Sequence, residues 1–82
     1  MNPKQLDLLM EAFPDEDFLK ADNFDDAIIG VEENTMKLIY SVSKCIEILS
    51  KEMTEEEAFD YFYFNVHGAY VGEKTPIWCY DI

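Results

Sequence analysis

The chain contains no arginine, and its six lysines stand against eighteen aspartates and glutamates, which gives the 82 residues a formal net charge of −12. Proteins hold phosphate groups and anionic surfaces mainly with arginine and lysine. A chain so poor in cations therefore predicts no direct binding of nucleic acid and no attachment to an anionic membrane. Excess carboxylate instead favours encounter with cationic macromolecules. We expect the partner to be a basic protein surface.

Cysteine and histidine are also scarce. The two cysteines, Cys45 and Cys79, lie far apart and outside any Cys-x-x-Cys pattern. Two such thiols do not form the disulfide framework of a secreted domain. Together with His67, the single histidine, they cannot supply four zinc ligands. The aspartates between positions 15 and 26 lack the central glycine and terminal glutamate of an EF-hand calcium loop. We expect free thiols, no metal and no cofactor.

The sequence also lacks the patterns of common catalytic sites. It has no glycine-rich phosphate loop and no nucleophile elbow. His67 and Asp60 share a side of one predicted helix, but two turns, about 10 Å, separate them, which is too far for a hydrogen-bonded dyad. A pair of His67 with Cys45 or Cys79 across the fold is geometrically possible but unsupported by spacing. We predict that the chain is not an enzyme.

Long apolar runs are absent too. No stretch approaches the roughly 18 residues that a membrane span requires. No basic-then-apolar leader opens the sequence, and acidic residues are dense near its start. We therefore expect a cytoplasmic protein without a membrane anchor.

What the chain does have is apolar content of 49%, with six Phe, five Tyr and one Trp. This is enough to fold one domain over residues 1–82. A domain of this size buries only about 60–65% of its unfolded surface, so oligomerisation is a natural supplement. The many rings indicate either an aromatic-rich core or rings at a rim or interface, where Tyr and Trp keep a polar tip wet.

The pattern of the first 40 residues predicts a helix, a connection and a hairpin. Asn2-Pro3 and the spacing of the following apolar residues favour an N-terminal helix over 1–13. Residues 15–26 form an irregular acidic connection, pinned by Phe18, Leu19 and Phe24. The core, residues 27–80, opens with strand-like runs at 27–31 and 36–40. Between them, Asn34 tolerates the positive φ of a tight turn.

The second half predicts two helices and a strand. Ser41 caps a helix with apolar residues at helical spacing from Val42 to Met53. The run Thr54-Glu55-Glu56-Glu57 is a capping box that opens a third helix, expected to reach about Val71. That helix is apolar around most of its circumference, so it needs cover on several sides. Residues 75–80 read as a last strand, with Pro76 near its start. The order α-β-β-α-α-β gives an α+β domain with a three-stranded sheet packed by helices.

Two acidic groups and one aromatic flank are the candidate partner-binding residues. The first acidic group lies in the connection, and the second surrounds the start of the third helix. Solubility and helix capping also explain such charge. The acidic candidates are Asp15, Glu16, Asp17, Asp22, Asp25, Asp26, Glu52, Glu55, Glu56 and Asp60. The aromatic flank consists of Phe59, Tyr63 and Tyr70.

Residues 24–80 carry a resemblance. The segments 44–49 (KCIEIL), 53–58 (MTEEEA) and 61–77 (YFYFNVHGAYVGEKTPI) resemble a family of short proteins encoded by tailed bacteriophages and prophages. Residues 65–76 are the most specific part. The resemblance implies a phage origin and an accessory role in a host cell, and it lends no catalytic residues. We expect Asn65, Gly68, Gly72, Glu73 and Thr75 to have structural roles, with the glycines allowing close approach at a helix end. A site role for the same residues is the lower-ranked alternative.

These observations lead to one functional hypothesis and one alternative. The first is a small acidic phage-type protein that binds a basic host protein, with antagonism of a host defence or nucleic-acid-handling complex as one version. In that version, the carboxylates of this chain occupy the positions that the phosphate groups of a nucleic acid would take on the host protein. The alternative is a homo-oligomeric structural or assembly module, in which the aromatic flank is a self-interface.

Overall fold

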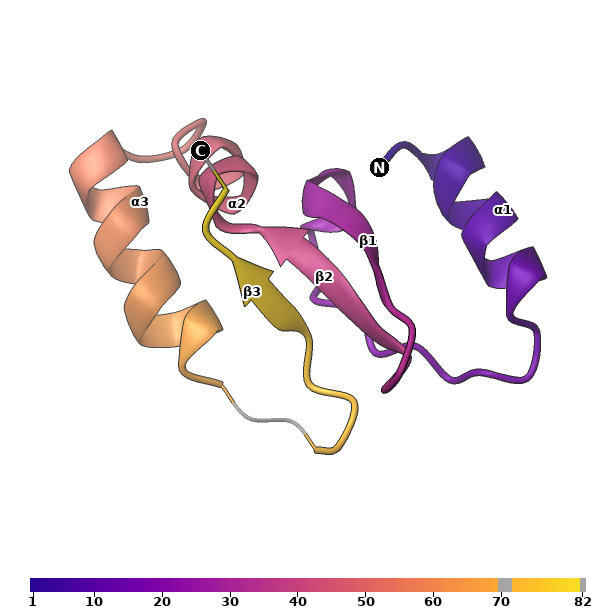
Figure 1. Ribbon diagram of the computed structural model, residues 1–82. Helices are drawn as coiled ribbons and strands as arrows, with labels where there is room; N and C mark the ends of the chain where they lie inside the picture. Colours follow the sequence, from indigo (N-terminus) through magenta and orange to yellow (C-terminus); the bar gives the residue numbers. More distant parts are fainter. Residues whose placement is uncertain (70–71, 82) are drawn as a thin grey trace.

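The computed structural model describes residues 1–69 and 72–81, and it shows the predicted α+β fold. A three-stranded sheet lies at the centre, with α3 on one side and α1 on the other (Figure 1). The element order is α-β-β-α-α-β, with two short additional helices. In chain order the elements are α1 (Pro3–Ala12), the 3₁₀ helix η1 (Asp25–Ala27), β1 (Ile28–Glu32), β2 (Lys37–Ser41), α2 (Val42–Leu49), α3 (Glu55–Tyr61), the π-helix η2 (Phe62–His67) and β3 (Ile77–Cys79).

The sheet is mixed, with strand order β1-β2-β3. β1 and β2 form the predicted antiparallel hairpin, while β3 pairs parallel to β2, with Ile39 opposite Ile77 and Tyr40 opposite Trp78. The register of the hairpin shifts between Ile28 and Gly30, which leaves Ile29 as an extra residue that is exposed. The chain returns to the sheet through α2, α3 and η2.

The core lies on the face of the sheet from which Leu38 and Tyr40 project. Both side chains are fully buried, together with Phe62 from η2 and Cys45 from α2. Trp78 packs edge-on against Phe62 at 5.4 Å between ring centroids and tilted against Tyr40 at 5.2 Å. Its indole nitrogen is buried and has no hydrogen-bond partner within residues 1–69 and 72–81. Some aromatic rings therefore belong to the core, while others lie exposed at the surface, so both predicted locations for the rings occur.

Local capping signals are confirmed at all three α-helices. Asn2 and Gln5 form a capping box at α1, with the Gln5 amide donating to Asn2 Oδ1 at 2.8 Å. Ser41 Oγ accepts from the Lys44 amide at the start of α2. Each cap satisfies an amide that has no partner inside its helix. α2 ends at Leu49, although the apolar spacing predicts a helix that continues to Met53.

The hairpin turn differs from the prediction in the residue that carries positive φ. Met36, with φ of 54°, adopts the left-handed conformation, and not Asn34. The Glu32 carboxylate accepts hydrogen bonds from the amides of Asn34 and Thr35 and from the Thr35 hydroxyl. These bonds hold the pKa of Glu32 below its usual value, with the Thr35 hydroxyl as the largest contribution. The carboxylate therefore organises a turn that lacks a glycine.

The connection between α1 and β1 is irregular up to η1, as predicted. Phe24 is buried and Phe18 half-buried, with Phe18 edge-on to Phe13 at 6.3 Å. Leu19, in contrast, is 37% exposed, so the prediction that it pins the connection is wrong. The Ala21 amide donates to the Tyr40 hydroxyl at 2.8 Å and ties the connection to the sheet.

The third helix is not the single regular α-helix that the sequence predicts. It begins at Glu55, changes to a π-helix at Phe62 and ends at His67, before the predicted end near Val71, which itself lies outside the described residues. Before β3, Gly72 has φ of +114°, and Thr75 Oγ1 donates to the Gly72 carbonyl. A Cβ at Gly72 would meet nothing within 4 Å, so the glycine serves this backbone conformation and not close approach. A Cβ at Gly68 would make only ordinary contacts, at 3.7 Å to the Tyr63 carbonyl oxygen and 3.9 Å to the Phe64 carbonyl oxygen.

Candidate functional site

The capping box at the start of α3 determines which carboxylates face solvent. The Glu57 amide donates to Thr54 Oγ1 at 3.2 Å, and the Thr54 amide donates to Glu57 Oε1 at 3.3 Å. Glu57 is thus engaged, whereas Glu55 and Glu56 have exposed side chains near the positive end of the helix dipole. The capping box therefore stabilises the start of α3 while Glu55 and Glu56 stay exposed to solvent.

The change from α to π geometry at Phe62 places the rings of this segment. The amide nitrogen of the Asn65 side chain donates to the Tyr61 carbonyl at 3.3 Å, at the junction of the two helix types. Phe62 itself is fully buried and anchors the junction in the core. π-Helical turns inside longer helices are rare and occur often at functional sites.

Three rings of α3 and η2 remain exposed: Phe59 at 44%, Tyr61 at 46% and Phe64 at 85%. Of the predicted aromatic flank, Phe59 is exposed, Tyr63 is half-buried, and Tyr70 lies outside the described residues. The ring of Tyr63 packs tilted against that of Phe59, at 4.8 Å between ring centroids. Within the flank, Phe59 is therefore part of the surface, and the half-buried Tyr63 supports it.

The most exposed ring, Phe64, was missed by sequence reasoning, although the run of rings from 59 to 64 contained the signal. Glu56, Asp60 and Phe64 follow one another at four-residue spacing, and all three are exposed. Residues four apart share one side of a helix. We name the outer sides of α3 and η2 that carry Glu55, Glu56, Phe59, Asp60 and Phe64 the acidic–aromatic face.

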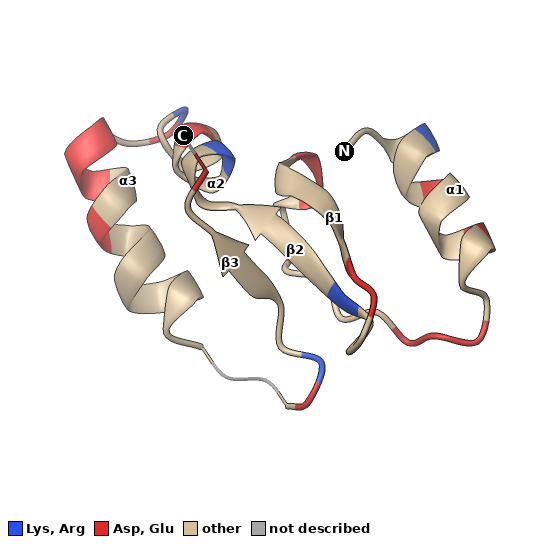
Figure 2. Ribbon diagram, viewed as in Figure 1, with Lys and Arg blue, Asp and Glu red and all other residues tan. Residues whose placement is uncertain are grey.

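The second acidic group belongs to this face or lies beside it. Glu52, Glu55, Glu56 and Asp60 are all exposed, and the sequence has no lysine or arginine between Lys51 and Lys74. Figure 2 shows the carboxylates concentrated at the start of α3, on the opposite side of the molecule from the acidic loop that follows α1. The N-terminal part of the first group and the second group therefore do not form one continuous anionic surface.

The first acidic group is partly engaged within the protein. Asp25 pairs with Lys20 at 3.5 Å, and Glu16 pairs with Lys74 at 3.1 Å. Asp15, Asp17, Asp22 and Asp26 have exposed side chains. Glu16 therefore serves the fold, which weakens the prediction that it contacts a partner.

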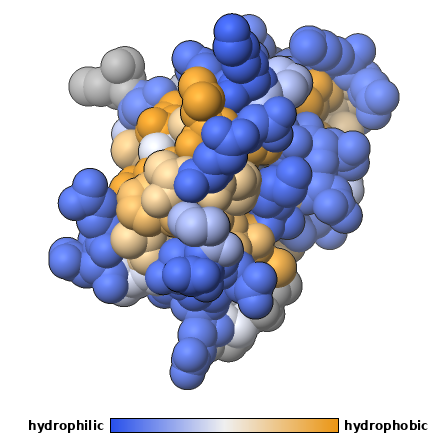
Figure 3. All heavy atoms as spheres, turned by 90° about the vertical axis from the view of Figure 1, so that its right-hand side faces the viewer, coloured by the Kyte–Doolittle hydropathy of each residue, from blue (hydrophilic) through white to orange (hydrophobic). Residues whose placement is uncertain are grey.

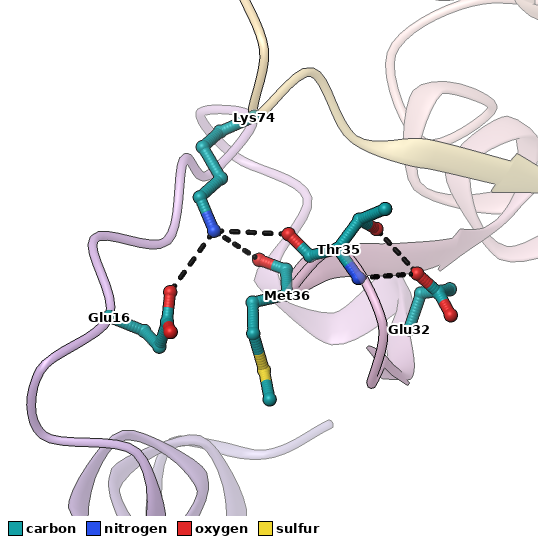
Figure 4. Close-up of polar contacts among 5 residues, drawn as sticks. All are labelled: Glu16, Glu32, Thr35, Met36 and Lys74. Atoms are coloured by element: carbon teal, nitrogen blue, oxygen red, sulfur yellow. Dashed lines mark hydrogen bonds and ion pairs between the residues drawn. The ribbon is translucent and has the colours of Figure 1, made fainter.

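Lys74 connects three segments that are distant in sequence. Its ammonium donates to Glu16 Oε2 at 3.1 Å, to the Thr35 carbonyl at 3.1 Å and to the Met36 carbonyl at 3.2 Å (Figure 4). The acidic connection, the hairpin turn and the loop before β3 thus meet at one cation. The carbonyl of Met36, the residue with left-handed backbone, is one of its acceptors.

A second polar cluster fastens the segment after β3 to the start of α2. Asp81 Oδ1 accepts hydrogen bonds from the hydroxyls of Ser41 and Ser43. These bonds, first of all that from Ser41, hold the pKa of Asp81 below its usual value. Ser41 is fully buried, so the cluster joins β2, α2 and the end of β3.

Cys45, Cys79 and His67 each have their own surroundings in the described part of the chain. Burial raises the pKa of the Cys45 thiol to about 12, and the Asp81 carboxylate adds to this shift. A thiol with such a pKa stays protonated near neutral pH and is a poor nucleophile. His67 instead packs its ring against Tyr63 at 5.1 Å and Phe62 at 6.0 Å. Cys79 is free and half-buried.

Comparison with known proteins gives no relative: no family model, no curated protein and no solved structure matches the chain. Within residues 1–69 and 72–81, no three His, Cys, Asp or Glu side chains are grouped so that they could hold a metal ion. No helix in that part of the chain is long and apolar enough to cross a membrane. The acidic–aromatic face is the candidate site because it combines exposed carboxylates with exposed rings.

Proposed function

We propose that this chain acts by binding a basic protein through the acidic–aromatic face. The observation that supports the proposal is the exposure of Phe64, at 85%, four residues after Asp60 and eight after Glu56, which are also exposed. Burying a phenylalanine side chain stabilises a complex by about 1.5–3 kcal/mol relative to leaving it in water. The carboxylates around it attract a cationic surface and orient the approach.

The resemblance to short phage and prophage proteins supports a host protein as the partner and the host cytoplasm as the place of action. Antagonism of a host defence or nucleic-acid-handling complex is the version that best uses the charge. A protein that binds DNA or RNA has a basic surface made for phosphates, and exposed carboxylates on a rigid helix can occupy it. The cost of exposing rings in the free chain is then recovered when the complex forms.

Affinity purification from infected host cells tests this function. The tagged wild-type chain is compared with a Glu56→Lys/Asp60→Lys variant and with a control that carries Asp7→Lys and Glu11→Lys on α1. All four sites are exposed, and both variants change net charge equally. We expect one host protein, identified by mass spectrometry, to be captured by the wild type and the control, with affinity that falls as salt rises. Equal capture by both variants, or none below physiological salt, contradicts the proposal.

Self-association is the second candidate function, and a different surface favours it. Viewed from the side of α1, the molecule shows a band of apolar side chains bordered by hydrophilic ones (Figure 3). On α1, Leu8 is 58% exposed although Leu6 is buried. This side lies away from α3, so self-association through it leaves the acidic–aromatic face free (Figure 1). Light scattering distinguishes the two: a dimer that Leu8→Asp dissociates supports the assembly module.

A further inference from the structure

A groove separates the acidic connection from the helices. Its walls are the segment 19–24 on one side, and the end of α2 with η2 on the other, and Trp78 of β3 also lines it. The groove has a volume of about 790 Å³. Pockets that bind small molecules typically have volumes of about 300–1,000 Å³. The groove is therefore large enough to admit a side chain from another molecule.

The walls are apolar and held in place before any ligand arrives. Phe24, Leu49, Val66 and Trp78 are among the apolar residues that line it, and Phe24 is buried. Trp78 is fixed by its contacts with Tyr40 and Phe62. The hydrogen bond from the Ala21 amide to the Tyr40 hydroxyl fixes the opposite wall. A preformed wall reduces the ordering cost of binding.

The charges at the groove come from both acidic groups. Asp22 belongs to the first group and Glu52 to the second, and both line the groove with exposed side chains. Lys20 and Lys51 also line it, and Lys20 is paired with Asp25 at 3.5 Å. The lining itself is therefore close to neutral, inside a molecule of net charge −12. Such a site accepts an uncharged group whose neighbours are cationic.

We infer that the groove receives one aromatic or branched aliphatic side chain from a basic segment of the partner protein, with lysines or arginines of that segment against Asp22 and Glu52. This inference rests on the proposed function and extends it. A second copy of the chain fits poorly, because it brings a further −12 and no arginine. An anionic small molecule meets the same repulsion.

The groove and the acidic–aromatic face are continuous through Tyr61. This residue lies on α3, is 46% exposed and lines the groove. A helix face of 13 residues is only about 20 Å long and 10 Å wide. It covers a part of the roughly 800 Å² that each partner contributes to a stable interface. The groove extends the surface toward that size.

A peptide titration of the full chain, followed by NMR and by the fluorescence of Trp78, tests the inference. Trp78 is the single tryptophan, so its emission reports on the groove alone. The probe is acetyl-Lys-Lys-Phe-Lys-Lys-amide, and the matched peptide has Ala in place of Phe. We expect the Phe peptide to bind at least tenfold more tightly and to shift the signals of Leu49, Val66 and Trp78. Equal affinity of the two peptides overturns the inference.

Two variants of exposed residues locate the binding. Asn65→Phe fills the groove from η2, and Glu52→Lys reverses a charge at its edge, with Glu47→Lys on α2 as the control outside the groove. We expect both groove variants, checked for folding by their NMR spectra, to weaken the Phe peptide at least fivefold, and the control to weaken it less than twofold. Unchanged affinity in folded Asn65→Phe and in Glu52→Lys overturns the inference.

The host partner separates failure of this inference from failure of the proposed function. A partner that loses affinity with Phe64→Ser but not with Asn65→Phe overturns the role of the groove and leaves the acidic–aromatic face intact. A partner that is unaffected by Phe64→Ser and by Glu56→Lys/Asp60→Lys overturns the proposed function itself. Loss of affinity with both Phe64→Ser and Asn65→Phe supports one continuous surface.

Discussion

Replacing Lys74 with methionine removes the cation that joins the acidic connection, the hairpin turn and the loop before β3, while keeping a side chain of similar length. We expect the protein to fold with lower stability. The three acceptors of the ammonium, Glu16 Oε2 and the carbonyls of Thr35 and Met36, then lose a charged donor at once. The left-handed backbone of Met36 loses one of its restraints.

The magnitude follows from the exposure of these groups. The side chains of Lys74 and Glu16 are 34% and 36% exposed, so their ion pair contributes about 0.5 kcal/mol. Each bond to a carbonyl contributes about 0.5–1 kcal/mol, because water can replace the ammonium at these partly exposed sites. The free energy of unfolding should therefore fall by about 1.5–2.5 kcal/mol. For a domain of this size the melting temperature then falls by about 10 °C.

Urea unfolding followed by circular dichroism measures the effect. Lys44→Met is the matched control, because Lys44 is exposed on α2 and its replacement changes net charge equally. Glu16→Gln removes the ion pair alone and should cost about 0.5 kcal/mol. If Lys74→Met is no less stable than Lys44→Met, the cation does not hold the three segments together and the reasoning is wrong.

Three further changes test the packing, the cap and the buried acids. Phe62→Ala should cost about 3–5 kcal/mol in thermal unfolding because the ring is fully buried, whereas Phe64→Ala should stay within about 0.5 kcal/mol; equal effects contradict the assigned burial. Thr54→Ala should lower stability in urea by about 1 kcal/mol through loss of the capping box, and no loss would mean that the cap is not formed in solution. Burial raises the pKa of Tyr40 and of Cys45 to about 12 from 10.0 and 9.0, so the unfolded chain loses these protons first and stability should fall between about pH 9 and 12. Unfolding at several pH values should show this slope, and it should flatten in Tyr40→Phe/Cys45→Ala; a slope unchanged by the double variant contradicts the assignment.

The sequence predicted well those features that depend on neighbouring residues. The caps at Asn2 and Ser41 and the capping box at Thr54 are local hydrogen-bond patterns, and they occur where the sequence predicts them. The hairpin follows from two strand-like runs and the residues between them. The α+β order follows from the same periodicities.

Other features depend on contacts between distant residues and could not be read from spacing. The parallel pairing of β3 with β2 and the meeting of Lys74 with Glu16 are long-range contacts without a local signature. The left-handed φ of Met36 is supported by the Glu32 and Lys74 contacts, so a propensity argument favoured Asn34 wrongly.

The candidate site was predicted in part. The carboxylates of the second acidic group and Phe59 are exposed, as a binding surface requires. Phe64 was missed although it follows Asp60 by four residues, and the π-helix that begins at Phe62 was not predicted. The approach of Asp22 and Glu52 across the groove needs the tertiary fold.

The parallel position of β3 has a consequence for biosynthesis. β2 is translated long before its neighbour, and its free edge can pair with β3 only after α2, α3 and η2 have left the ribosome. Until then, the growing polypeptide presents an open row of amides and carbonyls to other chains. The sheet is therefore completed only after β3 has been translated, and a truncation before Ile77 should yield aggregating product rather than a smaller folded protein.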